Sequence, residues 1–171
     1  MSNLKQWAQE KIAEQALVID IESTGGAFSD EMIELAIIDL SNLEVLYSSL
    51  LKPTTTLNYH AQKVHGISHY DLRKSPYLED QVEVINSIME SKTVISYNSA
   101  FDSRMLEQSY QKYLLETPKI TWQCLMQRCN VVFGSRKLSD LCTQFNIEKG
   151  THRAKSDALA AARLMHYLAD K

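Results

Sequence analysis

Two carboxylates separated by a single residue stand at the end of an apolar segment near the start of the chain. The segment LVIDIESTGG ends in Asp20, Glu22, two hydroxyl residues and two glycines. Because side chains alternate along a strand, Asp20 and Glu22 would share one face while Ile19 and Ile21 point to the other. Carboxylates held this close repel each other unless a proton or a cation neutralises them. The pattern therefore predicts a site for a hard divalent ion such as Mg²⁺ or Mn²⁺, with a solvated strand end as the alternative.

Two later segments add further groups of the same chemistry. In SYNSAFDSRM, Asp102 follows a short apolar strand and falls in the first turns of a helix, where the helix dipole favours an acid. In GTHRAKSDALAAA, His152 precedes Asp157 by five residues at the entry to the last helix, with Ser156 or Asp157 as its cap. Each of these residues alone is typical of a helix end or a surface position. Together the three segments supply four carboxylates and one imidazole, each at a strand end or a helix start.

The elements that must position these groups follow from the hydrophobic pattern. The segment from Leu4 to Ile12 has helical spacing, and LVIDIE is apolar on both faces, as expected of a central strand. The remaining pattern predicts an antiparallel hairpin over 32–40 and 45–52, helices over 78–90 and 100–113, a strand over 93–97, a strand turning into a helix over 120–126, and helices over 137–147 and 156–170. There is no repeat or linker, so we expect one α/β domain.

Composition limits the class of protein. The chain has 171 residues, of which 44% are hydrophobic, which is enough for the core of one globular domain. The chain has no apolar run of the ~18 residues that a membrane span needs, and its start is too polar for a secretory signal. We therefore expect a cytoplasmic protein without a membrane partner. In a reducing compartment the three cysteines, an odd number without paired metal-site spacing, are expected to be free core thiols.

Charge is distributed unevenly along the chain. The net charge of −3 argues against a protein that coats nucleic acid through bulk charge. However, residues 10–44 contain many acids and only one base, Lys11, whereas residues 128–155 are predominantly basic. Two such regions that fold together could hold cations and a polyanion side by side, although solvated surface charge would give the same pattern.

The ordered motifs DxE, NxxFD and HxAxxD resemble the DnaQ-like, or DEDDh, family of 3′→5′ exonucleases, which includes the proofreading subunit of bacterial DNA polymerase III and exonuclease X. The resemblance runs from about residue 17 to residue 167, and VHGIS at 64–68 and RKLSDLCTQFNI are similar to further family segments. It implies a ribonuclease-H-like α/β fold, with a mixed central sheet flanked by helices on both faces. It also implies a catalytic core over 17–167 and two divalent metal ions, Mg²⁺ or Mn²⁺. The helical spacing before this core predicts a leading helix over 1–16.

The resemblance assigns a role to each of the five motif residues. Asp20 resembles the carboxylate that bridges both metals, and Glu22 and Asp157 match ligands of the metal on the nucleophile side. Asp102 matches the residue that holds the second metal through water, and His152 corresponds to the general base. These roles agree with the chemistry, because an imidazole with an ordinary pKa of ~6.5 can accept a proton from water near neutral pH.

Six further residues are candidates for contact with the substrate. By resemblance, Ser23, Thr24 and Gly25 line the terminal nucleotide, and the other candidates are His65, Asn98 and Phe101. Phe101 is also a good core residue, and its pattern favours the core over the substrate groove. The chain departs from the common pattern at Tyr97, where family members often carry His, and at Ser23, where they often carry Thr. All five catalytic positions match, so the resemblance predicts an active enzyme.

Three functions remain open at this point. The leading hypothesis is a metal-dependent exonuclease that releases nucleoside 5′-monophosphates from the 3′ end of DNA, favouring single strands, alone or beside a DNA polymerase. The second is an exonuclease that trims RNA or short oligoribonucleotides, and the third is a non-catalytic subunit that binds a polymerase or a nucleic-acid end. Sequence does not separate DNA from RNA, because such proteins read a strand largely through backbone and stacking contacts.

Overall fold

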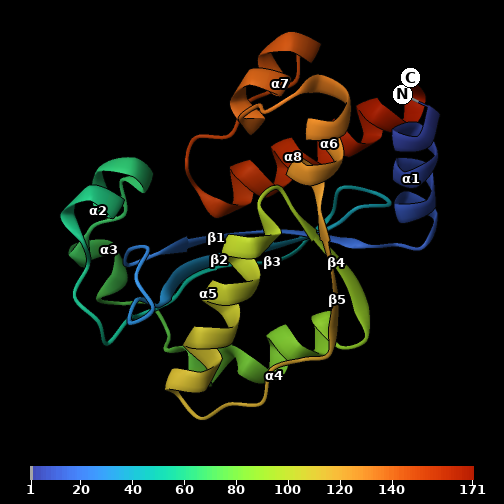
Figure 1. The fold of residues 1–171 in the computed structure, drawn as a ribbon. Coiled ribbons are helices and arrows are strands. Elements are labelled where there is room, and N and C mark those ends of the chain that lie inside the picture. The colour runs from blue at the N-terminus through green and yellow to red at the C-terminus, as the bar shows by residue number, and fades with distance from the viewer. Residues whose placement is uncertain (1) are drawn as a thin grey trace.

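A five-stranded mixed sheet forms the centre of the computed structural model, which describes residues 2–171 (Figure 1). The strand order is β3-β2-β1-β4-β5. β1 pairs antiparallel with β2 and parallel with β4, β2 pairs antiparallel with β3, and β4 pairs parallel with β5. The strands are β1 (Leu17–Ser23), β2 (Met32–Asp39), β3 (Val45–Leu50), β4 (Lys92–Ser96) and β5 (Ile120–Cys124). The predicted mixed sheet and its antiparallel hairpin are confirmed.

Helices cover both faces of the sheet, as the resemblance implied (Figure 1). One face carries α1 (Ser2–Ala13), α6 (Leu125–Phe133), α7 (Leu138–Phe145) and α8 (Ala154–Asp170), and the other carries α4 (Leu78–Met89) and α5 (Ser99–Lys112). Two short helices, α2 (Tyr59–His65) and α3 (His69–Leu72), stand at the end of the sheet away from the chain termini. Along residues 2–171, no helix is long and apolar enough to cross a lipid bilayer.

The alternation predicted for β1 is present in the core. Ile19 and Ile21 belong to the apolar cluster that the sheet forms with α4 and α5. Val18 belongs to the opposite cluster, which includes Ala158 and Ala161 of α8. Since every second side chain shares a face, the residues that follow Val18 on its face are the two carboxylates of the DxE motif. The acids therefore lie on the side of the sheet that α8 covers.

The leading helix is part of the same core as the closing helix. Leu4, Trp7 and Ala8 are buried against α8, and Gln9 Nε2 donates a hydrogen bond to the Ala169 carbonyl oxygen (2.9 Å). The three cysteines are buried and free, as predicted. The division of the chain into a leading helix and a catalytic core stays a prediction, and Met1 lies outside the described residues.

The two short helices have no counterpart in the prediction, which left that segment mixed. They have seven and four residues, too few to show a helical period, and side chains at their starts stabilise them. The Asn58 side chain accepts from the His60 and Ala61 amides, and Ser68 and Asp71 form a reciprocal capping box. A second difference is the start of α8, which begins at Ala154 rather than near Ser156.

Candidate active site

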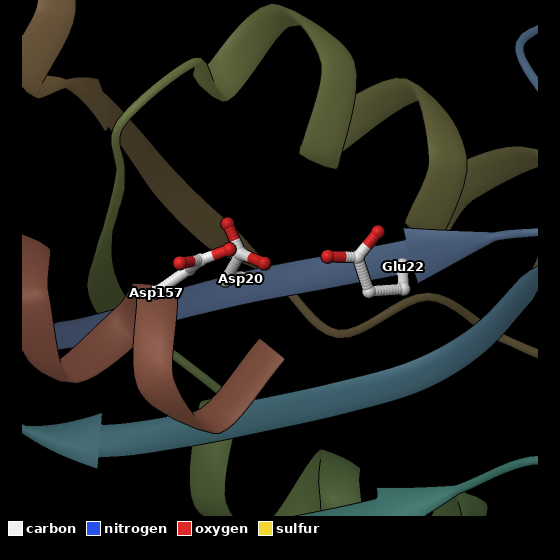
Figure 2. A group of neighbouring side chains, drawn as sticks. All are labelled: Asp20, Glu22 and Asp157. Carbon is white, nitrogen blue, oxygen red and sulfur yellow. The ribbon is translucent and has the colours of Figure 1, made fainter. Parts of the chain in front are cut away.

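Three carboxylates meet at the carboxyl end of β1. Asp20 and Glu22 project from the strand, and Asp157 reaches them from the first turn of α8 (Figure 2). One oxygen of each residue lies within 4.8 Å of the other two. Because β1 and β4 run parallel, their carboxyl ends share an edge of the sheet, and this edge is where ligands bind in many α/β folds.

Burial and mutual repulsion make this cluster hold protons in the absence of a cation. Desolvation, followed by Asp102 and Glu22, raises the pKa of Asp20 well above its ordinary value. Desolvation, followed by Asp157, raises the pKa of Glu22 to about 8, and desolvation also raises the pKa of Asp157. A group of carboxylates with raised pKa values gains most from a bound cation, which replaces the protons.

Asp102 lies beside the cluster but is held differently. It is buried in the first turn of α5, where its Oδ1 accepts from the Ile21 amide (3.1 Å) and its Oδ2 accepts from Ser96 Oγ (2.8 Å). Desolvation raises its pKa to about 7, against the lowering effect of these hydrogen bonds. The structure thus brings Asp102 into the same cavity as Asp20 but outside the group of three, with both oxygens already accepting hydrogen bonds.

His152 is the exposed member of the site. It adopts a left-handed backbone conformation (φ 57°) just before α8 and lines a cavity of about 250 Å³ together with Asp20, Asp102 and Asp157. We call this space the carboxylate cavity. Nearby, a Cβ atom on Gly150 would overlap the Asp157 carboxylate, so only glycine fits at this position. Sequence reasoning missed Gly150, although a glycine two residues before the histidine of the motif was a visible signal.

Glu34 is a second residue that sequence reasoning missed. This buried acid on β2 stands directly opposite Glu22 in the antiparallel pair. It accepts from Arg153 Nε (3.1 Å) and from an Arg153 terminal nitrogen (2.7 Å), and it also accepts from the Ala154 amide (2.9 Å). The prediction that Ser156 or Asp157 caps the last helix is wrong, because both lie inside the first turn and the Glu34 carboxylate takes the free amide. An acid in the middle of the apolar run MIELAII was the available signal.

A second cavity, which we call the α2 cavity, borders the first. It has a volume of about 440 Å³ and is lined by Glu22, Ser23, Gly25 and residues of α2, including His65. The His65 ring is buried, and its Nδ1 accepts from the Ile67 amide (3.0 Å). Burial lowers the pKa of His65, so the ring is neutral and carries its proton on Nε2. Among residues 2–171, this Nε2 has no hydrogen-bond partner of good geometry.

The hydroxyl side chains that follow the DxE motif form hydrogen bonds within their own loop. Thr24 is fully buried and its hydroxyl donates to Asp30 Oδ1 (2.9 Å), while Ser23 Oγ donates to the Gly25 carbonyl (2.7 Å). A Cβ atom on Gly25 would meet the Asp30 carboxylate at 2.5 Å, so the glycine is required by packing within the loop. Ser23 and Gly25 reach the α2 cavity, whereas the Thr24 side chain points into the loop.

The last two candidates are Phe101, which lies where the two cavities meet, and Asn98. Phe101 lines both the carboxylate cavity and the α2 cavity, and it also packs against the apolar cluster under α5. The structure therefore places it in the core and at the surface of the site at once. Asn98 is exposed at the start of α5 and lines the carboxylate cavity. All the predicted site residues except Thr24 reach one of the two joined cavities.

The donor set fits hard divalent cations. Asp20, Glu22 and Asp157 offer carboxylate oxygens at short mutual distance, and Asp102 adds a buried acid that lines the same cavity as Asp20. Hard cations such as Mg²⁺ and Mn²⁺ prefer oxygen ligands, and the repulsion within the cluster supplies the reason for their binding.

Comparisons with known proteins agree with this site. A family model described as exonuclease matches residues 17–165. An uncharacterized exonuclease of Escherichia phage 186 is 26% identical over 115 residues, which cover 67% of this chain and 59% of that protein. The PolC-type DNA polymerase III of Mycoplasmopsis pulmonis is 26% identical, over 86% of this chain and 11% of the polymerase. The chain thus spans less than two thirds of both relatives. The epsilon subunit of DNA polymerase III from Buchnera aphidicola subsp. Schizaphis graminum is 24% identical, over 89% of this chain and 71% of that subunit.

Solved structures share the fold. The nuclease domain of 3′hExo, described as a DEDDh family member bound to rAMP, has a TM-score of 0.74 and 17% identity, covering 90% of this chain and 91% of that one. Exonuclease X in complex with 5′ overhanging duplex DNA has a TM-score of 0.71 and 22% identity, with 90% of each chain covered. Pop2p of S. pombe in a form bound to Mg²⁺ and Mn²⁺ has a TM-score of 0.71 and 16% identity, covering 99% of this chain and 90% of that one. These likenesses confirm the ribonuclease-H-like fold.

Proposed function

This chain belongs to the DnaQ-like exonuclease family, whose members use divalent metal ions, and we propose that it removes nucleotides one at a time from the 3′ end of DNA. The observation that carries the proposal is the meeting of Asp20, Glu22 and Asp157. Two of these acids, Asp20 and Asp157, line the same cavity as Asp102 and His152. The choice of DNA rests on the sequence relatives, which include a PolC-type DNA polymerase III and an epsilon subunit of DNA polymerase III. These relatives also point to a DNA polymerase as a partner.

In this proposal Asp20, Glu22 and Asp157 hold the divalent ions, Mg²⁺ or Mn²⁺, and Asp102 contributes a further carboxylate in the cavity that Asp20 lines. When bound, such ions supply Lewis-acid activation of an attacking water and stabilise the leaving oxygen. His152 accepts the proton of that water, because this exposed residue lines the cavity and an imidazole can act as a general base near neutral pH. Asp157, five residues along the chain, interacts electrostatically with this imidazole.

The terminal nucleotide would occupy the α2 cavity. The buried His65 Nε2–H provides a hydrogen-bond donor, and Phe101 provides an aromatic face between the two cavities. Backbone atoms of Ser23 and Gly25 approach the same space, since their side-chain volume is small. These contacts would receive one nucleotide at the end of a strand, in keeping with the removal of nucleotides one at a time.

The test is a paired degradation assay. DNA and RNA oligonucleotides of the same sequence, labelled at the 5′ end, are incubated with Mg²⁺ or Mn²⁺, each with a free or a phosphorylated 3′ end. We expect a ladder of single-nucleotide steps from free 3′ ends of DNA, and protection by the 3′ phosphate. Asp20→Asn should abolish the ladder, whereas Asp170→Asn, an exposed acid at the end of α8, should not. Stronger cleavage of RNA than of DNA would identify RNA as the substrate. No cleavage of either would refute the proposal that the protein is an enzyme.

A further inference from the structure

A further groove, on the α6 and α7 side, continues the carboxylate cavity away from α2. We call it the α6–α7 groove. It has a volume of about 520 Å³, and it shares Tyr97, Asn98, Lys137 and Leu138 with the carboxylate cavity. The α2 cavity shares none of these residues and meets the carboxylate cavity at Phe101 and nowhere else in their linings. The carboxylate cavity therefore lies between two spaces, one on each side.

The charge of the α6–α7 groove is opposite to that of the cavity it continues. Arg136 and Lys137, both exposed, come from the segment between α6 and α7. No ion pair formed within residues 2–171 includes either of them. Asp140 also lines the groove, but its carboxylate is directed to the start of α7, where it accepts from the Lys137 amide (3.3 Å). Two cations thus lie next to a cavity lined by acids, an arrangement suited to an extended anion that passes from one to the other.

Tyr97 fixes the segment that carries these cations. Its hydroxyl donates to the Arg136 carbonyl oxygen (2.7 Å). Its own carbonyl oxygen accepts from the Met126 amide (2.9 Å), at the start of α6. Tyr97, which directly follows β4, therefore forms hydrogen bonds with the start of α6 and with the segment that follows the end of α6. The hydroxyl bond is a single contact that can be removed without altering either cation.

We propose that the α6–α7 groove binds the nucleotide on the 5′ side of the scissile bond, through phosphate contacts to Arg136 and Lys137. Tyr97 is the positioning residue that holds the Arg136 backbone in place for this contact. The proposal rests on the proposed function, because it assumes that the terminal nucleotide fills the α2 cavity and that the rest of the strand leaves on the opposite side. Phosphate contacts of this kind add affinity without reading sequence.

Two substrates separate this groove from the chemistry. One is a single-stranded DNA oligonucleotide, and the other is the p-nitrophenyl ester of thymidine 5′-monophosphate, which has the terminal nucleotide but nitrophenol in place of the remaining strand. For Arg136→Gln/Lys137→Gln, we expect the ratio of kcat/KM for the oligonucleotide to that for the ester to fall about tenfold, through a higher KM for the oligonucleotide. The slope of log kcat/KM against log salt should flatten by about 0.7 for each charge removed.

Tyr97→Phe provides the second arm, because it retains both cations. It should raise the KM for the oligonucleotide relative to the ester while leaving the salt slope as in the wild type. Lys92→Gln, at the other end of β4, is the matched control and should change neither ratio nor slope. Equal losses on both substrates, or an unchanged ratio in the double variant, would overturn the proposal.

Failure of the proposed function has a distinct signature. If the wild type cleaves neither substrate, the exonuclease proposal fails. Fluorescence anisotropy with a fluorescein-labelled oligonucleotide then tests whether the α6–α7 groove binds the strand. Weaker and less salt-dependent binding by Arg136→Gln/Lys137→Gln than by Lys92→Gln would support it. Equal binding by the two variants would refute it.

Discussion

Loss of Arg153 should destabilise the folded protein more than loss of the Glu34 charge, although the two side chains form one ion pair. The Glu34 side chain is 7% exposed and stands opposite Glu22, whereas the Arg153 side chain is 45% exposed. Removal of the arginine leaves a buried acid beside another acid, with no cation in contact. Removal of the acid's charge leaves an arginine that can turn into water. The difference in burial therefore predicts which variant is more destabilised.

The magnitudes follow from the geometry. Arg153→Met should lower the free energy of unfolding by about 3 kcal/mol, the lower end of the range for a buried charge that loses its partner, because the arginine was partly exposed. Glu34→Gln keeps an acceptor for the Ala154 amide and should cost about 1 kcal/mol, the value of an ordinary hydrogen bond. The double variant should be more stable than Arg153→Met alone, since the unpaired charge is then absent.

Urea unfolding followed by circular dichroism, at pH 7.5 in EDTA, measures all three variants. Lys155→Met is the matched control, an exposed cation two residues further on, and should change stability by less than about 0.5 kcal/mol. The reasoning is refuted if Glu34→Gln costs as much as Arg153→Met, or if the double variant loses the sum of the two. A fall in kcat should accompany both single changes, because Arg153 adjoins His152 and begins α8.

Three further predictions concern the catalytic groups. His152→Gln should lower kcat about 10²- to 10⁴-fold with little change in KM in a steady-state assay, and an unchanged kcat would remove it as general base. Gly150→Ala should displace the Asp157 carboxylate and weaken Mg²⁺ binding in calorimetry, whereas Gly26→Ala, where a Cβ meets nothing within 4 Å, should not. In metal-free protein the free energy of unfolding should fall as pH rises from about 4.5 towards 8, because Glu22, whose pKa is raised to about 8, stays protonated in the folded chain after the unfolded chain has lost that proton. The slope should reach about 1.4 kcal/mol per pH unit for this one proton, and Glu22→Gln should flatten it if Glu22 is the cause.

The hydrophobic pattern of the sequence was sufficient to predict much of the architecture. The alternation of apolar residues and acids over Leu17–Ser23 already placed Asp20 and Glu22 on one face, because the side-chain period of a strand is fixed by its backbone. The long helices followed from their hydrophobic period. The two short helices α2 and α3 did not, because a helix of one or two turns has no period to detect and is stabilised by side-chain caps and by contacts from elsewhere.

The sequence by itself determined which groups could do the chemistry, and only the tertiary structure decided how each one is held. Asp157 joins Asp20 and Glu22 across a sequence separation that no local rule spans, and it does so because Gly150 leaves room for its carboxylate. Glu34 reaches the start of α8 from β2, so that an acid of the sheet replaces the cap expected from the helix itself. Side-chain types and strand period are properties of the chain, whereas such contacts depend on where the packed sheet brings distant segments together.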